Sequence, residues 1–254
     1  MAKTTLRFVL TFALMSLACF WSMRAFAFED PTKGEPFFPW LWEDQFVPTF
    51  KAAGETGSLV ILGSGVGATV ISERYDDEVR EANQNNQRLS EDFAGIGSKL
   101  GSGAPGILIA TAQLFFDQPN GLAHGRALAL TSASHISIAL IAQRTRPNGD
   151  RTLSFPSGHG SSAFATATSL AYSYGWWVGV PSFAAAYLVS AARVADDAHW
   201  LSDVVAGAAL GIFWGRASAI SDKYRDSSKK ETSNFRFVPS TIPGGAIVVL
   251  RWEN

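Results

Sequence analysis

The chain has 254 residues, of which 47% are hydrophobic and 17% charged, and its formal net charge at pH 7 is −1. A chain of this length can bury one sizeable core, and its composition is more apolar than that of an average globular domain. The near-neutral charge gives no reason to expect a nucleic-acid partner, because nucleic-acid-binding proteins carry concentrated basic patches.

The first predicted element, residues 1–27, has the pattern of a secretory signal peptide. Lys3 and Arg7 precede an apolar stretch, and residues 25–27 (Ala-Phe-Ala) offer the small-x-small sequence that signal peptidase cleaves. We therefore expect export to the periplasm, with an uncleaved membrane anchor as the alternative. Cleavage after this tripeptide would remove Cys19, the single cysteine, so the mature protein would form no disulfide.

The next segment, residues 28–58, is rich in proline and aromatic residues. This composition indicates an irregular N-terminal arm that packs on the surface through its rings. Residues 59–71 are apolar but contain three glycines, and residues 73–89 are charged without a continuous apolar face.

Five apolar segments follow, separated by turns that contain Gly, Pro or Asp. They cover residues 107–116, 126–144, 161–174, 176–192 and 201–217. Helices of this length with short connections indicate an all-α helical bundle, which we expect to form one domain over residues 59–222. In the remaining tail, residues 223–254, two short apolar stretches flank Pro-Gly-Gly at 243–245, a pattern that predicts a β-hairpin or a pair of extended segments.

Whether these helices cross a membrane depends on their length. A span needs about 20 mainly apolar residues. The longest stretch without a charge or a histidine, residues 160–192, is interrupted by Gly175, Gly179 and Pro181, so each half is short for a span. We therefore expect a soluble exported domain, with an enzyme integral to or associated with the inner membrane as the alternative.

Polar residues able to bind an anion lie at two predicted helix ends. Arg146 precedes a proline, which disfavours helical geometry at the arginine and ends the helix near it. Ser157, Gly158 and His159 lead into the next helix, where free backbone N–H groups and the helix dipole attract an anion. Gly158 also lets the backbone approach anion oxygens closely. Taken alone, this pattern is better explained as an ordinary turn with a serine cap.

A further arginine, Arg193, closes a later helix and is followed by His199 and Asp203. The spacing of four places the last two on one face of a helix, where the carboxylate can hold one imidazole nitrogen and leave the other basic. Such a pair is common on helix surfaces, so its significance depends on the anion-binding residues found earlier in the chain. Together, these groups could hold a tetrahedral oxyanion and attack it.

The three blocks resemble the signature of the type 2 phosphatidic acid phosphatase (PAP2) superfamily, which also contains bacterial acid phosphatases and vanadium haloperoxidases. The resemblance covers about residues 139–203 and rests on Arg146-Pro147, Pro156-Ser157-Gly158-His159 and Arg193-x5-His199-x3-Asp203. It implies an all-helical fold whose active site lies at helix ends within a bundle. It also implies phosphohistidine chemistry that needs no metal and no cofactor.

The resemblance implies a role for each matched residue. His199 would be the nucleophile, Asp203 would orient it, and His159 would protonate the leaving oxygen and then activate water. The equatorial phosphoryl oxygens would be bound by Arg146, Ser157, Gly158 and Arg193.

Two positions depart from the family pattern. Where the family has a lysine, seven residues before the arginine of Arg-Pro, this chain has Ala139, and it has Ala192 where the third block normally has serine. Arg144 or His135 could replace the missing cation, although an arginine at a helix end is more often solvated and a histidine on a helix is more often part of the core.

We therefore predict an exported phosphatase that hydrolyses phosphomonoesters or pyrophosphates, whether soluble or lipid-linked. Its partner would be a phosphorylated small molecule or lipid, and membrane association is compatible with this prediction. The alternatives are a vanadate-dependent haloperoxidase and a catalytically weakened phosphate- or lipid-binding relative that lacks the lysine of the family.

Overall fold

The structure is a computed structural model that describes residues 37–85, 91–225, 234–242 and 245–253. The predicted signal peptide therefore lies outside the described residues. The first described elements are α2 (Phe37–Pro39), the π-helix η1 (Trp40–Phe46) and α3 (Val47–Ala53).

These elements form a helical segment where the sequence indicated an irregular arm. Pro48 lies in the first turn of α3, where a missing N–H costs no helical hydrogen bond. Trp42, Phe46 and Phe50 recur every four residues, and successive ring centroids lie 6.4 and 6.3 Å apart. Residues at this spacing are neighbours on a helix, so the aromatic rings support helical geometry.

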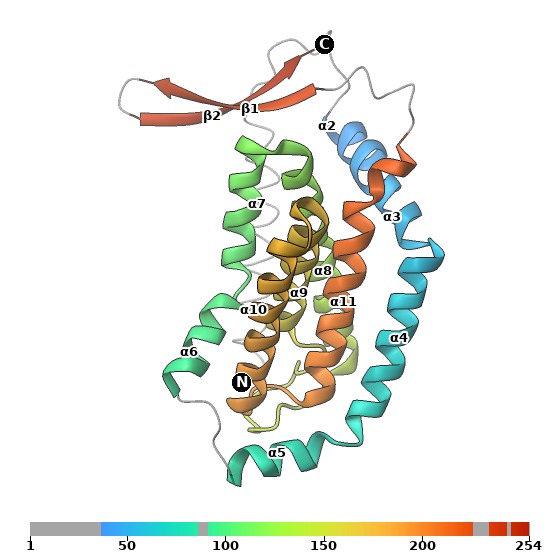
Figure 1. Ribbon diagram of the computed structural model, residues 1–254, viewed down its shortest axis with the longest axis vertical. Helices are drawn as coiled ribbons and strands as arrows, with labels where there is room; N and C mark the ends of the chain where they lie inside the picture. Colours follow the sequence, from blue (N-terminus) through green and yellow to red (C-terminus); the bar gives the residue numbers. More distant parts are fainter. Residues whose placement is uncertain (1–36, 86–90, 226–233, 243–244, 254) are drawn as a thin grey trace.

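Three helices connect this segment to the predicted bundle: α4 (Thr56–Glu73), α5 (Asp76–Asn85) and α6 (Glu91–Leu100). In Figure 1, α4 runs along one side of the bundle and α5 crosses the end at which α4 finishes. The charged composition of α5 follows from this position, because only a few of its residues are buried.

The prediction of an all-α bundle is confirmed. Its five helices are α7 (Ala104–Phe116), α8 (Gln118–Ala142), α9 (Gly158–Tyr174), α10 (Trp176–Ala195) and α11 (Leu201–Ala219). A short 3-10 helix, η2 (Ser221–Tyr224), follows α11. The C-terminal ends of α8 and α10 and the N-terminal ends of α9 and α11 all lie at the same end of the bundle (Figure 1). The connections that carry the predicted site residues therefore gather at this end.

The predicted C-terminal hairpin is also present. Strands β1 (Asn234–Ile242) and β2 (Gly245–Glu253) pair antiparallel, with Ile242 opposite Gly245 at the turn. Figure 1 shows this hairpin at the opposite end of the molecule from α5, so it is remote from the predicted site.

Glycines on α11 let its backbone approach α9 closely. A Cβ atom on Gly207 would lie 2.6 Å from the Ser157 carbonyl oxygen, and one on Gly211 would clash with the Ser161 carbonyl oxygen. The spacing of four residues places both glycines on one face of α11, an arrangement also used by tightly packed helices in membranes. This contact fixes the start of α9 relative to the start of α11.

Three helices are long and apolar enough to cross a membrane, by length and composition: α4, α8 and α10. Their outer faces carry large apolar side chains, with Val60 59%, Ile141 84% and Tyr187 67% exposed. Apolar patches of this extent normally mark contact with a membrane or another protein. These features support the membrane-associated alternative over the soluble domain that we favoured from the sequence.

The close packing of α9 and α11 predicts opposite outcomes for two glycine-to-alanine substitutions. Gly211→Ala should lower the stability by about 1–3 kcal/mol, because the new methyl group meets a rigid backbone carbonyl. Gly67→Ala on α4 should leave the stability unchanged or raise it slightly, because nothing lies within 4 Å of the added atom. The melting temperatures of the two purified variants in detergent measure these effects. Equal melting temperatures for the two variants would contradict the close packing of α9 against α11.

Candidate active site

Ser157 joins the starts of the two helices that carry the predicted site. It is the N-cap of α9, where its hydroxyl accepts a hydrogen bond from the backbone N–H of Gly160 at 3.3 Å, so the ordinary serine cap given as the alternative to anion binding is present. Its own backbone N–H donates to the Asp203 carbonyl oxygen at 2.9 Å. The anion-binding turn and the predicted nucleophile region are therefore held at a fixed separation.

His199 lies in the connection between α10 and α11, and its side chain is 3% exposed. Its Nδ1 lies 2.8 Å from the Ser154 carbonyl oxygen and 3.6 Å from Oδ2 of Asp203. Because a carbonyl oxygen can only accept, Nδ1 carries the proton and Nε2 keeps the basic lone pair. The expectation that His199 and Asp203 share a helix face is wrong, since α11 begins at Leu201.

Asp203 is fully buried in the first turn of α11 and accepts three hydrogen bonds. The donors are Oγ of Ser154 at 2.5 Å, the backbone N–H of Trp200 at 2.9 Å and Nη1 of Arg144 at 2.8 Å. Burial alone would raise the pKa of Asp203, but the neighbouring His199 ring, these hydrogen bonds and the Arg144 charge lower it. The carboxylate is therefore ionised and fixed in place.

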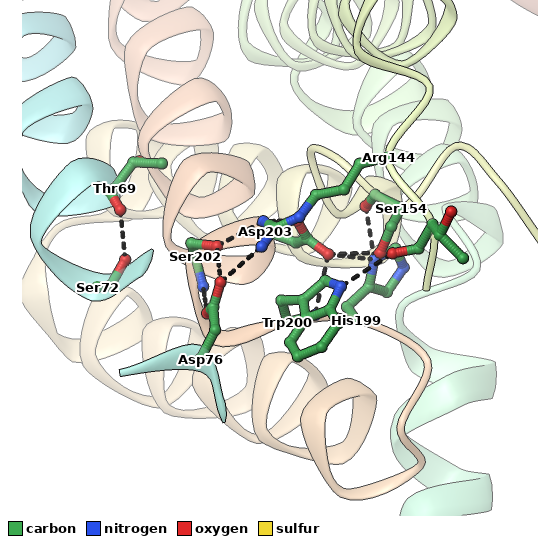
Figure 2. Close-up of polar contacts among 10 residues, drawn as sticks. Thr69, Ser72, Asp76, Arg144, Ser154, His199, Trp200, Ser202 and Asp203 are labelled. Atoms are coloured by element: carbon green, nitrogen blue, oxygen red, sulfur yellow. Dashed lines mark hydrogen bonds and ion pairs between the residues drawn. The ribbon is translucent and has the colours of Figure 1, made fainter. Parts of the chain in front are cut away.

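Arg144 belongs to this carboxylate network (Figure 2). Its Nη2 donates to Oδ2 of Asp76 at 2.7 Å, while its Nη1 contacts both Asp203 and Oγ of Ser202. Asp76 also accepts hydrogen bonds from the backbone N–H of Ser202 at 2.8 Å and from the Ser202 hydroxyl at 2.6 Å. A residue of α5 thus caps the start of α11, and Arg144 is engaged with two carboxylates, so it does not replace the missing lysine.

The remaining cationic groups form what we call the basic cluster: His135, Arg146, His159, Arg193 and His199. Burial is the main cause that lowers the pKa of His159 to about 4, and the neighbouring groups Arg193, His199, Arg146 and His135 add to it. The five groups are therefore close enough to interact electrostatically. The structure therefore brings together the residues that three separate blocks of sequence contribute.

The two arginines of the cluster differ in how they are held. Nη2 of Arg193 contacts Oδ2 of Asp196, and its Nη1 donates to Oγ of Ser98 on α6 at 3.0 Å. The Nε atoms of Arg146 and Arg193 are buried and have no hydrogen-bond partner among the described residues. Buried donors without partners are costly, and an anion at the cluster would satisfy them.

Sequence reasoning missed three residues of the site: Ser154, Asp76 and Ser202. Ser154 precedes the motif turn by three residues and was hidden in a loop, although it contacts both His199 and Asp203. Asp76 lies 126 residues before Ser202 in a segment that was interpreted only as charged. A buried carboxylate cannot be distinguished from a solvated one by composition, and no signal in the sequence marked this one.

Residues 120–226 match the family model described as PAP2 superfamily. The chain is 41% identical over 75 residues to a lipid A 1-phosphatase of Porphyromonas gingivalis, which covers 28% of this chain and 17% of that protein. It is 31% identical over 94 residues to a lipid A 4′-phosphatase of Helicobacter pylori, which covers 37% of this chain and 46% of that protein. The chain therefore spans less than half the length of either relative.

The crystal structure of LpxE from Aquifex aeolicus resembles this fold with a TM-score of 0.52 and 26% sequence identity. The similarity covers 58% of this chain and 94% of that one. Sequence and structure comparisons therefore agree on the family that the motif blocks indicated.

The lowered pKa of His159 predicts that anion binding is coupled to proton uptake. At pH 6 the imidazole is neutral, because its pKa of about 4 lies below the solution pH. A bound phosphate would offset the neighbouring positive charges, raise this pKa and draw a proton onto His159. Calorimetric titration with phosphate in two buffers of different ionisation enthalpy measures the number of protons taken up on binding. His159→Gln should take up fewer protons than the wild-type protein, and equal uptake by the two proteins would contradict this assignment.

The Asp76 network predicts different effects for two adjacent carboxylates. Asp76→Asn should destabilise the protein by roughly 3 kcal/mol, because it leaves Arg144 and Ser202 without a buried anionic partner. Asp77→Asn is the matched control, since Asp77 is exposed on the same turn and should change stability by less than about 0.5 kcal/mol. Thermal melting measures the difference, and a null effect at Asp76 would remove it from the network.

Proposed function

We propose that the protein is a membrane-associated phosphatase of the PAP2 superfamily, whose family model matches residues 120–226, and that it removes a phosphate group from a phosphorylated lipid. The single observation that carries this proposal is the geometry of His199. Its Nδ1 is bonded to a carbonyl oxygen, so a basic Nε2 is left beside a cluster of cationic groups suited to a phosphoryl group.

In the first step, Nε2 of His199 attacks the phosphorus atom and forms a P–N bond. The bond between phosphorus and the lipid oxygen breaks, and His159 gives its proton to that oxygen. Arg146, Arg193 and the N–H groups at the start of α9 stabilise the negative charge that builds on the equatorial oxygens. The carbonyl of Ser154 stabilises the positive charge that His199 acquires as a phosphoimidazolium.

In the second step, water attacks the phosphorus atom and the P–N bond breaks. His159, now neutral, accepts a proton from this water, and inorganic phosphate leaves. Both histidines then return to their starting protonation states. The cycle consumes one water molecule and releases the dephosphorylated lipid and one phosphate.

Two observations support a lipid as the substrate over a soluble phosphate ester. Both curated relatives are named as lipid A phosphatases, although each is matched over less than half of its length. The apolar faces of α4, α8 and α10 also suit a chain that lies in a bilayer, where a lipid phosphate would reach the end of the bundle by lateral diffusion. We therefore propose a phosphorylated glycolipid of the lipid A type as the first substrate to test.

His199 and the substrate class can be tested together. Replacement of His199 with Ala should lower the turnover of a phosphorylated lipid at least about a thousandfold, because the nucleophile is lost. His124→Gln is the matched control, because His124 is buried on α8 but lies in a separate hydrogen-bonded group, and this variant should keep most of the activity. Phosphate release is measured for lipid A, phosphatidic acid and p-nitrophenyl phosphate, with melting temperature as the folding control.

Two results would contradict the proposal. Unchanged turnover by the His199 variant would remove this residue from the nucleophile role. Faster turnover of p-nitrophenyl phosphate than of either lipid would contradict a lipid as the substrate.

A further inference from the structure

We infer that His135 of α8 is a phosphoryl-binding residue of this site. The inference rests on the proposed function and adds to it a residue outside the matched motif residues.

The His135 ring lies against the start of α9. A Cβ atom built on Gly158 would lie 2.7 Å from Nε2 of His135 and 3.0 Å from its Cε1. Gly158 is the first residue of α9, where the backbone N–H groups have no helical acceptor. The imidazole therefore occupies the side of the anion-binding turn that a side chain at position 158 would otherwise fill.

The ring also lies among the cationic groups of the site. His135 is one of the residues that act electrostatically on His159, together with Arg193, His199 and Arg146. The groups that share the electrostatic field of His159 with His135 come from different elements: Arg193 on α10, Arg146 in the connection after α8, and His199 in the connection before α11. A bound phosphoryl group would interact favourably with all of these cations at once.

One nitrogen of His135 lacks a partner. Nδ1 is buried without a hydrogen bond to any residue that the structure describes. His124, also on α8, has both nitrogens satisfied, with Oε1 of Gln113 at 2.8 Å and Oγ1 of Thr166 at 3.2 Å. His124 thus has both nitrogens bonded within the core, whereas Nδ1 of His135 has no partner among the described residues. The other ring nitrogen of His135, Nε2, is the one nearest Gly158, and the ring also forms a hydrogen bond with the backbone of Pro156.

A substitution at Ala139 can test whether a cationic side chain at the place of the His135 ring binds phosphate. It lies one helical turn after His135 on the same face of α8 and is only 4% exposed. Side chains on a helix lean toward its N-terminus, so a lysine at 139 would extend over the place of the His135 ring. Removing the ring should create the room that this lysine needs.

The experiment measures binding of inorganic phosphate to the full chain in detergent by isothermal titration calorimetry. His135→Ala should weaken binding about tenfold, as expected for the loss of one charge-assisted hydrogen bond. The double variant His135→Ala/Ala139→Lys should restore the affinity to within about threefold of the wild-type value. His124→Ala should lower the melting temperature but leave the phosphate affinity within about twofold.

Two results would overturn the inference. One is wild-type affinity in His135→Ala, and the other is a double variant that binds as weakly as His135→Ala. Because binding needs no turnover, the inference and the proposed function fail separately. A wild-type protein that binds phosphate but hydrolyses no phosphorylated lipid would refute the function alone, whereas an active wild-type protein with an unaffected His135 variant would refute the inference alone.

Discussion

The arrangement of the site depends on the contacts of one serine. The carbonyl oxygen of Ser154 accepts the Nδ1 proton of His199, and its hydroxyl donates to Asp203. The first contact fixes the tautomer that leaves Nε2 basic, and the second ties the same loop to the first turn of α11. Asp203 thus acts on His199 mainly by holding Ser154, since its own oxygen is 3.6 Å from the imidazole. Without this loop the nucleophile would have neither a defined protonation state nor a defined direction.

Around this point the structure separates two kinds of charge. Asp76 and Asp203 share the single positive charge of Arg144 and also accept hydrogen bonds from groups at the start of α11, which together stabilise their negative charge. The basic cluster on the other side contains Arg146 and Arg193, and burial together with the neighbouring groups lowers the pKa of His159. A site of this kind is poorly satisfied when empty and gains most from a multiply charged anion. The close contact of α9 with α11 holds the carboxylate network and the basic cluster in fixed positions relative to each other.

Much of this architecture could be predicted from the sequence because it follows from local signals. Apolar periodicity and Gly or Pro breaks located the five bundle helices, and Ser157 caps α9, which was the alternative to its predicted role in phosphate binding. The helical nature of residues 37–58 was missed because proline was taken as a breaker although Pro48 lies in a first turn, where it is tolerated. The role of Arg144 and Asp76 could not be predicted, because it depends on α5 crossing the end of the bundle. Spacing in the chain also misplaced His199, which lies before its helix.

The fold and the site fit the proposed phosphatase, with outer helices that suit a membrane and a proposed nucleophile, His199, that is oriented by a backbone carbonyl. The central claim is that Ser154 leaves Nε2 of His199 free to attack phosphorus. It is tested most directly by trapping the covalent intermediate with a phosphorylated lipid, then using ³¹P NMR and mass spectrometry to identify the phosphorylated atom. The account predicts a phosphoryl group on Nε2 of His199. A phosphoryl group on Nδ1, or on any other residue, would contradict it.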